Sequence, residues 1–395
     1  MFFDLFKIIK IITLILLNKK VIIYTVRSRF GSVATGLALF ETYLEGKNFN
    51  YIILINFNKN TIFNKYITKR GYDIFNSIRV PYTFLRILTL LKLDKNISPF
   101  HKNFHTNDEG EVSAKFPYLN FNEYVEIKDS NKVSYFVKDN CIVFSVKEEG
   151  FYDEKSKTWG RFNYKNFKQP VYEFDKFERL IPAVKIAISK GYNVIRVGRN
   201  LNKIDFQHPN FFDYASSEFT SDRNDFIIAK HCKFVLTNGT GFDALAALWF
   251  KKPIYFYNLR NYRYMHTHFP FRMFNPILCL NKDRKINYKK VLKVESKYWN
   301  NGLYTKSHIQ HANYKLMKFG YKYKYYDSDI ISKSIIKFIN DYEGLNLNNI
   351  NKIYLENSDL EFWQFYNKVY NKKLTNEGRS FDMKKIFIKP NADLL

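Results

Sequence analysis

The chain has 395 residues, of which 46% are hydrophobic and 25% charged, and its formal net charge is +26. This composition is sufficient for a core in each of two domains and excludes a disordered chain. The three cysteines, Cys141, Cys232 and Cys279, lie far apart without a CxxC pair. We therefore expect neither a disulfide framework nor a structural zinc site, and a reducing compartment fits.

The positive charge has two explanations. It favours polyanionic partners such as nucleic acid, anionic lipid or phosphorylated substrates. The chain is also rich in Lys, Asn, Ile, Phe and Tyr, whose codons are AT-rich, so genome composition can supply part of the lysine content. The basic residues are spread along the chain, and no helix-turn-helix, zinc-finger or RNA-recognition signature is present. We therefore expect no nucleic-acid partner.

Residues 1–20, MFFDLFKIIKIITLILLNKK, predict an amphipathic helix. Lys7 and Lys10 interrupt the apolar run, which is shorter than the ~20 residues that a membrane span needs. The run leads directly into a strand pattern, without a small-residue cleavage site. The helix either lies in a membrane interface, on an anionic surface, or packs on the first domain. We expect a cytoplasmic protein, with a peripheral position on the inner face of the cytoplasmic membrane as one option.

The first half predicts strands at 21–26 (VIIYTV) and 51–57 (YIILINF), joined by a turn and the helix LALFETYLEG. This strand–turn–helix–strand order is typical of a parallel sheet with helices on its faces. Gly31, in the turn RFGS, either admits an acceptor or only turns the chain. A third strand is possible at SIRVPY (77–82).

The second half repeats this pattern. It predicts strands at 141–146, 193–199, 233–237 and 253–258, and helices that end at Gly191 and cover 222–232 and 241–250. The predicted fold is α/β, with two Rossmann-like domains facing a cleft (GT-B-like) and a helical C-terminal tail. The domains are 1–20 (N-terminal helix), 21–135 (N-terminal, acceptor domain), 136–325 (C-terminal, donor domain) and 326–395 (helical C-terminal extension).

The turn NGTG lies between a strand and a helix. Its residues Asn238, Gly239, Thr240 and Gly241 are candidate phosphate ligands, because glycines allow close backbone approach and a helix start attracts anions. The alternative is a tight turn with Thr240 as the helix N-cap. The turn matches neither a Walker loop nor a GxGxxG motif.

The strand NVIRVGR places Arg196 and Arg199 at or just past its carboxyl edge. An arginine in a core strand needs a carboxylate, a phosphate or water. We favour anion binding, and the alternative is an ion pair with Asp222 or Asp225, both of which are candidate cleft residues.

The segment KEEGF sets Lys147, Glu148 and Glu149 at a third strand end, beside the same edge if the strands are parallel neighbours. Either glutamate could act as a general base or bind hydroxyl groups, and the alternative is a solvated loop acid. DSD (327–329) precedes a predicted helix, so its aspartates are expected to cap that helix rather than bind metal. HTH (266–268) has no ligand partner at a suitable spacing, so no metal site is expected.

Several stretches together resemble a family of bacterial glycosyltransferases of surface-polysaccharide loci, with GT-B-like architecture. The matching stretches are FPYLNFNEYVEI (116–127), CIVFSVKEEGFYDE (141–154), residues 178–199, residues 214–258 and FIKPNADLL (387–395). The chain departs from the family at Lys147-Glu148, where the family has Arg-Asp, and at Asn238 and Thr240, where serine is usual.

The resemblance implies a metal-independent enzyme without a cofactor. It would transfer sugar from a nucleotide-sugar donor to a glycan or lipid-linked acceptor in cell-envelope polysaccharide biosynthesis. Arg196, Arg199 and the NGTG amides would hold the diphosphate, and Arg196 would stabilise the leaving group. Glu148 or Glu149 would be the catalytic base. The alternatives are a GT-B-fold nucleotide-sugar epimerase and a non-enzymatic basic protein that binds nucleic acid or anionic lipid.

Overall fold

The structure is a computed structural model of the chain. It describes residues 6, 9–10, 12–14, 16–17, 21–26, 51–56, 97–98, 132–138, 140–148, 158–159, 162–163, 175–198, 202–250, 252–259, 272–276, 278–281, 284–285, 289, 293, 321–324 and 327–343. The chain divides into two compact units. One is Met1–Tyr124 with Leu248–Phe250, and the other is Val125–Ala247 with Lys251–Leu395.

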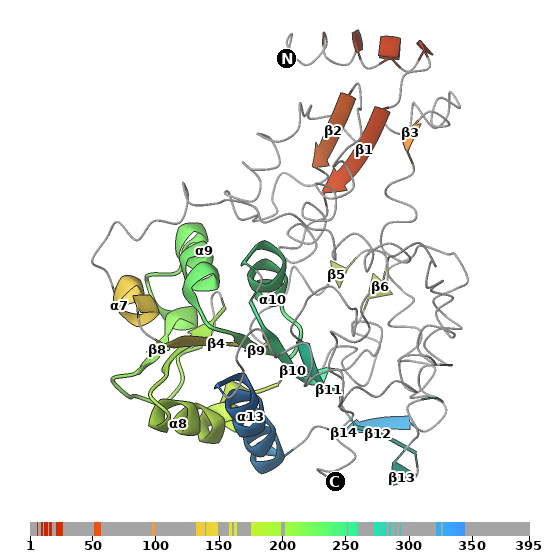
Figure 1. The fold of residues 1–395 in the computed structure, drawn as a ribbon. Coiled ribbons are helices and arrows are strands. Elements are labelled where there is room, and N and C mark those ends of the chain that lie inside the picture. Colours follow the sequence, from red (N-terminus) through yellow and green to blue (C-terminus); the bar gives the residue numbers. More distant parts are fainter. Residues whose placement is uncertain are drawn as a thin grey trace. The chain divides into compact units, whose positions relative to one another are not determined.

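The first unit contains a small parallel sheet. Strands β1 (Val21–Val26), β2 (Tyr51–Asn56) and β3 (Ile97–Ser98) lie in the order β2-β1-β3 (Figure 1). The register pairs Val21 with Tyr51 and runs without a shift to Val26 and Asn56. The predicted strands at 21–26 and 51–57 and their parallel pairing are therefore confirmed. Gly31 and the segment SIRVPY lie outside the described residues.

The start of the chain is helical at each described position from residue 6 to residue 16. The Thr13 hydroxyl donates to the Ile9 carbonyl over 3.0 Å, and the Leu17 amide donates to the Thr13 carbonyl over 2.9 Å. The predicted helix is confirmed at these positions. Within the described part of the chain, no helix combines the length and hydropathy needed to cross a membrane.

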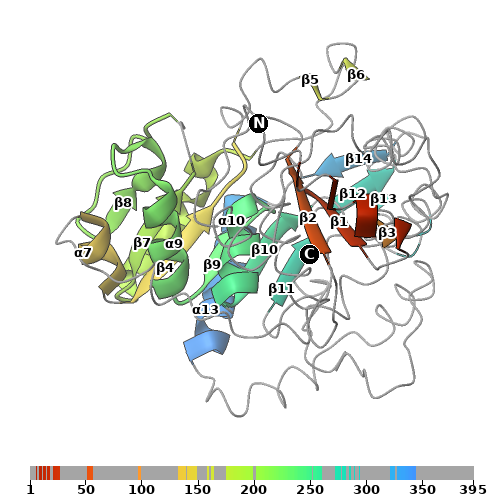
Figure 2. The same cartoon turned by 90° about the horizontal axis from the view of Figure 1, so that it is seen from above.

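The second unit is built on a six-stranded parallel sheet, with the order β11-β10-β9-β4-β7-β8. The strands are β4 (Cys141–Ser145), β7 (Asn193–Val197), β8 (Phe211–Asp213), β9 (Val235–Thr237), β10 (Ile254–Leu259) and β11 (Arg272–Pro276). Figure 2 shows the six strands side by side from β8 to β11. In chain order this is 3-2-1-4-5-6, the doubly wound order of Rossmann-type domains.

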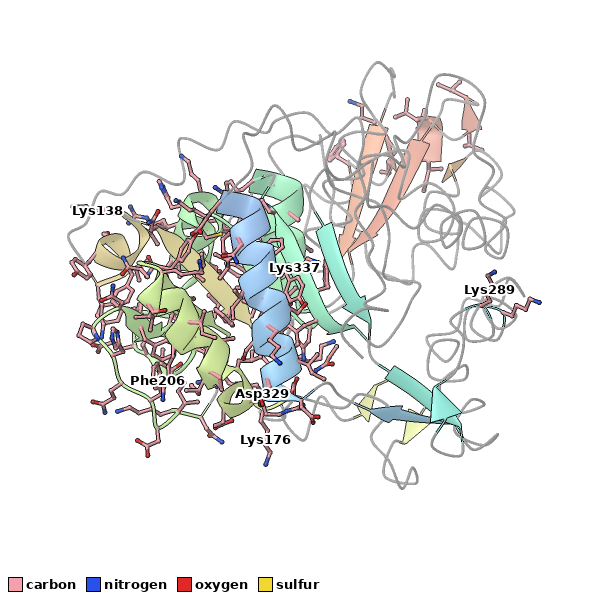
Figure 3. The ribbon with its side chains drawn as sticks, turned by 60° about the horizontal axis from the view of Figure 1, so that its bottom comes forward. Lys138, Lys176, Phe206, Lys289, Asp329 and Lys337 are labelled. Carbon is pink, nitrogen blue, oxygen red and sulfur yellow. The ribbon has the colours of Figure 1, made fainter. Side chains whose placement is uncertain are left out.

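Helices cover both faces of this sheet, as Figure 1 shows. The helices α8 (Ile181–Ser189) and α13 (Ser328–Glu343) pack together on one face (Figure 3). On the other face lie α7 (Lys132–Lys138), α9 (Asp222–His231) and α10 (Gly241–Ala244), which continues as the π-helix η7 (Leu245–Trp249). Because both faces are covered, every residue of β4 is buried, as expected for a central parallel strand.

A large hydrophobic cluster lies between the sheet and the α8–α13 layer. Phe144, Leu236 and Tyr255 from three strands pack there with Val184 of α8 and Ile335 of α13. The Tyr255 hydroxyl is hydrogen-bonded to Ser334 of α13. The helix α13 is thus an integral part of this core, and residues 344–395 of the predicted tail lie outside the described residues.

Smaller elements complete the second unit. A 3-10 turn, η5 (Phe177–Leu180), precedes α8, and η6 (Tyr214–Ser216) follows β8. The strands β5 (Thr158–Trp159) and β6 (Phe162–Asn163) form an antiparallel pair. A separate antiparallel sheet contains β12 (Leu278–Asn281), β13 (Arg284–Lys285) and β14 (Tyr321–Lys324).

The predicted strands and helices from Cys141 to Asn258 are confirmed, with ends that differ by one or two residues. Gly191 ends α8 with φ of +84°, as its predicted role at the helix end requires. Asp329 lies in the first turn of α13, which agrees with its predicted place at a helix start. The elements α7, β3, β5, β6 and β8 and the strands after β10 were not predicted from the sequence.

Candidate functional site

The carboxyl ends of β4 and β9 lie side by side at the centre of the sheet, where Ser145 pairs with Thr237. The crossover from β4 passes through α8 on one face, whereas the crossover from β9 passes through α10 on the other. This reversal is the topological switch point at which open α/β sheets bind ligands. The residues that follow these two strands therefore form the candidate site.

Two hydrogen bonds join the segments that leave the two strands. The hydroxyls of Ser145 and Thr240 lie 2.6 Å apart. The Lys147 amide donates to the Asn238 side-chain oxygen over 2.7 Å. The predicted placement of Lys147 and Glu148 at the same edge as NGTG is confirmed, because β4 is the parallel neighbour of both β7 and β9.

The side chain of Thr237, the last residue of β9, forms hydrogen bonds that hold the NGTG loop in place. Its hydroxyl oxygen accepts from the amides of Gly239 (3.0 Å) and Thr240 (3.3 Å) and donates to the Asp243 carboxylate (3.3 Å). Gly239 has φ of +93°, a conformation that favours glycine. Two of the predicted phosphate-binding amides are thus occupied by the protein. All four loop residues, Asn238 to Gly241, remain partly exposed.

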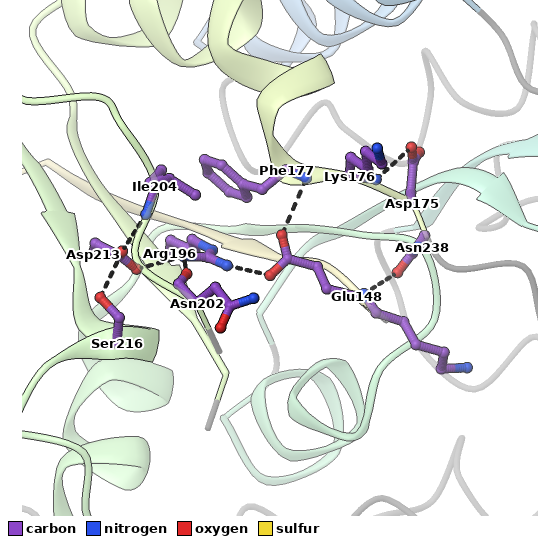
Figure 4. Close-up of polar contacts among 11 residues, drawn as sticks. Glu148, Asp175, Lys176, Phe177, Arg196, Asn202, Ile204, Asp213, Ser216 and Asn238 are labelled. Carbon is purple, nitrogen blue, oxygen red and sulfur yellow. Dashed lines mark hydrogen bonds and ion pairs between the residues drawn. The ribbon is translucent and has the colours of Figure 1, made fainter. Parts of the chain in front are cut away.

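Arg196 lies in the interior of the site and contacts two carboxylates (Figure 4). Its Nη2 donates to Glu148 Oε2. Its Nη1 donates to Asp213 Oδ1 and to the Asn202 carbonyl, and both of these Nη1 bonds are 2.9 Å long. The guanidinium carbon is 5.1 Å from the centroid of the Phe177 ring. The ion-pair partners are therefore Glu148 and Asp213, and not Asp222 or Asp225.

These contacts bear on the predicted role of Arg196 as a phosphate ligand. The side chain is only 2% exposed, and both terminal nitrogens donate to the protein. Its Nε is buried without a hydrogen-bond partner. Because the side chain is buried, a direct contact between Arg196 and a phosphate would require the residues that cover it to move. Arg199 lies outside the described residues.

Glu148 is held at both carboxylate oxygens. Oε1 accepts from the Phe177 amide over 3.1 Å, while Oε2 accepts from Arg196. Burial raises the pKa of the Glu148 carboxyl, and the nearby Arg196 charge and the hydrogen bonds from Arg196 and Phe177 oppose this rise without cancelling it. A largely buried carboxyl with a raised pKa at the switch point of the sheet is suited to acid–base chemistry. Glu149 lies outside the described residues.

Asp213, at the end of β8, supports the site from the far side of Arg196. Its Oδ2 accepts from the Ser216 hydroxyl over 2.7 Å and from the Ile204 amide over 3.4 Å. Asp213 thereby connects Arg196 to the segments before and after β8. The sequence signal was the aspartate that ends the apolar run FFD, a run too short to be recognised as a strand.

Asp175 is a second carboxylate that the sequence analysis missed. Its amide donates to the Lys147 carbonyl over 3.1 Å, and its carboxylate accepts from Arg179 (2.9 Å) and Asn258 (3.3 Å). Asn258, near the end of β10, has φ of +47°. These contacts tie the ends of β4 and β10 to the segment that starts α8.

Asp222 and Asp225 lie at the start of α9. Ser221 caps this helix by accepting from the Asn224 amide over 3.1 Å. Asp225 is buried and accepts from the Tyr214 hydroxyl over 2.9 Å. Both aspartates therefore belong to the helix N-terminus. Within the part of the chain that the structure describes, no cluster of three His, Cys, Asp or Glu side chains could hold a metal ion.

No family model matches the chain, and no curated protein matches it. Among solved structures, the chain is similar to a Listeria monocytogenes protein provisionally described as a UDP-N-acetylglucosamine 2-epimerase. The two share 10% identity over 74% of this chain and 90% of that chain, with a TM-score of 0.31. The resemblance to a glycosyltransferase family stays a prediction.

Proposed function

We propose that this chain is an enzyme acting on a nucleotide sugar. More specifically, we propose a glycosyltransferase that uses a glycan or lipid-linked acceptor in cell-envelope polysaccharide biosynthesis. The observation that carries the proposal is the Glu148–Arg196–Asp213 ion-pair network at the switch point, beside the loop Asn238–Gly241. A nucleotide bound at this edge would lie next to a carboxyl suited to proton transfer.

Glu148 is the proposed catalytic base, which would remove a proton from the acceptor hydroxyl. The bonds from Phe177 and Arg196 fix the orientation of its carboxylate. Arg196 then acts as a positioning residue, because it reaches the reaction only through Glu148. This arrangement gives the carboxylate a fixed geometry before substrate binds, which reduces the cost of orienting it in the transition state.

The diphosphate of the donor is proposed to bind at the partly exposed loop Asn238–Gly241. Thr240 and Asn238 carry polar side chains there, and Lys147 follows β4 at the same edge. The ammonium group of a lysine beside the loop would interact with a diphosphate as a point charge rather than as a bidentate ligand. Arg199 and Glu149 remain part of the proposal on sequence grounds alone.

A thermal-shift screen against GDP-, UDP-, dTDP- and CMP-sugars tests the proposal. One nucleotide class should raise the Tm in proportion to the logarithm of its concentration, because a ligand that binds the native state stabilises it. Glu148→Gln should keep this shift and lose transfer activity. The matched control is Glu218→Gln, which makes the same change at an exposed position. The absence of a shift with every nucleotide would contradict the proposal.

A nucleotide-sugar epimerase is the second candidate. It is favoured by the presence of two carboxylates, Glu148 and Asp213, on opposite sides of Arg196, since an epimerase needs acid and base groups around one sugar. NMR analysis of the sugar nucleotide after incubation without an acceptor separates the candidates. An epimerase forms a stereoisomer under these conditions, whereas a transferase needs an acceptor. A protein that binds DNA with a steep salt dependence and ignores sugar nucleotides would contradict both.

We also propose that the enzyme works at the inner face of the cytoplasmic membrane. The support is the helical N-terminal segment together with the net charge of +26.

A further inference from the structure

The exposed apolar side chains of the described residues are concentrated at the start of the chain. Phe6, Ile9, Leu16 and Leu17 are between 51% and 75% exposed. Tyr135 of α7 is the fifth exposed large apolar residue in the described part of the chain. Exposed apolar residues that occur singly need no explanation, but four within twelve positions form a patch, and such patches mark interaction surfaces.

The four side chains lie on one face of the helix. With 3.6 residues per turn, positions 6, 9, 13, 16 and 17 fall within an arc of about 100°. Thr13 is the one polar member, and its hydroxyl donates to the Ile9 carbonyl, so it presents its methyl group without an unpaired donor. The half-buried Ile12 extends the stripe on one side, and on the other side Lys10 ends it, with the half-buried Leu14 beyond. This apolar face is continuous and directed to solvent.

The charges around this face identify the kind of partner. Residues 1–20 contain Lys7, Lys10, Lys19 and Lys20 against a single acid, Asp4, which leaves a side-chain charge of +3 (4 − 1). Lys10 is exposed and lies at the edge of the stripe. A basic helix with an apolar face lies in the interface of anionic bilayers, where the lysines approach the headgroups and the apolar side chains enter the acyl boundary.

We propose that the face formed by Phe6, Ile9, Leu16 and Leu17 binds an anionic lipid bilayer, with the helix parallel to its surface. The inference deepens the proposed function, since it names the surface and the lipid class through which a transferase would reach a membrane-borne acceptor. The binding itself depends on no nucleotide. Failure of the membrane interaction and failure of the sugar-nucleotide proposal are therefore separate results.

Vesicle flotation of the full chain tests this proposal. The protein should float with phosphatidylcholine vesicles that contain 30% phosphatidylglycerol and bind pure phosphatidylcholine at least tenfold more weakly. The double variant Leu16→Gln/Leu17→Gln should lose at least tenfold in partition coefficient. Lys10→Gln should lose about fivefold on anionic vesicles only. Tyr135→Gln, which removes an exposed apolar residue from α7, is the matched control and should bind like the wild type.

The other outcomes would overturn the proposal. Equal binding to both vesicle types would exclude anionic recognition, and no binding to either would exclude a lipid surface. If light scattering shows that the wild type is a dimer and that the Leu16→Gln/Leu17→Gln variant is a monomer, the face serves self-association instead. A fall of several degrees in the Tm of the same variant, without vesicle binding by the wild type, would assign it to packing within the chain. The nucleotide thermal shift should be the same in every variant.

Discussion

Arg196 on β7 and Glu148 after β4 form a buried ion pair that joins β7 to the carboxyl end of β4, next to the switch point between β4 and β9. Asp213 lies on the other side of Arg196, so one guanidinium pairs with two carboxylates. Arginine suits this position because its fixed fork can donate in two directions at once. The same geometry that stabilises the edge also orients the carboxylate proposed to take part in catalysis.

Removing the Arg196 side chain should strongly destabilise the second unit. Arg196→Ala leaves Glu148 and Asp213 largely buried without their cation, and breaking a buried pair in this way costs about 3–5 kcal/mol in unfolding free energy. Urea denaturation followed by circular dichroism measures this loss. Lys203→Ala, at an exposed position nearby, is the control and should change stability by less than about 0.5 kcal/mol. A loss below about 1 kcal/mol for Arg196→Ala would show that the ion pairs are not formed in solution.

The pKa of Glu148 predicts how its charge affects stability as the pH changes. Burial raises the folded-state pKa above its ordinary value of 4.5, so the folded chain holds this proton more tightly than the unfolded chain. The resulting stabilisation is fully present below pH 4.5 and is lost as the pH rises through the folded-state pKa. The free energy of unfolding of the wild type minus that of Glu148→Gln should therefore decrease with rising pH in this window. A difference that instead rises with pH below pH 4.5 and stays constant above it would show that Arg196 dominates and lowers the pKa.

The central strands could be predicted because their apolar runs are determined locally. CIVFSV and NVIRV are almost entirely buried, as in strands covered on both faces, and β-branched residues mark these two runs and VIIYTV as strands. The need of Arg196 for a carboxylate was equally clear, because an arginine in a core strand cannot remain unpaired. The partners of Arg196 could not be predicted, since Glu148 and Asp213 are 48 and 17 residues away in the sequence. They contact Arg196 only because the strand order is β4-β7-β8.

Asp175 illustrates the same limit within the candidate site. The sequence predicts Asp175 as part of the helix that ends at Gly191, whereas its partners Arg179 and Asn258 come from η5 and β10. The strand β8 was missed because three residues cannot display a periodicity, and its place follows from pairing with β7. The occupation of the Gly239 and Thr240 amides by Thr237 is likewise a matter of loop geometry, which the motif NGTG does not specify.

Cys141 and Cys232 should be unreactive in the native protein. Both are buried, and burial raises the pKa of Cys141 and raises that of Cys232 to about 12. With a pKa of about 12, only about one Cys232 thiol in ten thousand is ionised at pH 8, and the thiolate is the reactive species. In a Cys279→Ser variant, Ellman's reagent should detect no thiol under native conditions and two thiols in guanidinium chloride. Reaction of either thiol within minutes under native conditions would show that the core opens locally.

Thr237 is expected to determine the shape of the NGTG loop. Thr237→Val keeps the volume of the side chain but removes the oxygen that accepts from the Gly239 and Thr240 amides and donates to Asp243. Leaving such groups unsatisfied costs about 1–3 kcal/mol each when they are buried, and less here because the loop is partly exposed. Thr237→Ser keeps the oxygen and should lose about 1 kcal/mol for the buried methyl group. The two variants therefore separate the hydroxyl from the packing.

The effect on ligand binding should follow the same division. If the loop holds a diphosphate, Thr237→Val should need at least ten times more nucleotide than the wild type to reach the same rise in Tm. The reason is that the backbone facing the ligand is no longer fixed. Thr237→Ser should preserve it. A Thr237→Val variant that is folded, as judged by circular dichroism, and binds nucleotide like the wild type would remove the loop from the donor site. The donor phosphates would then have to bind elsewhere along the carboxyl edge, beyond the reach of Thr240 and Asn238.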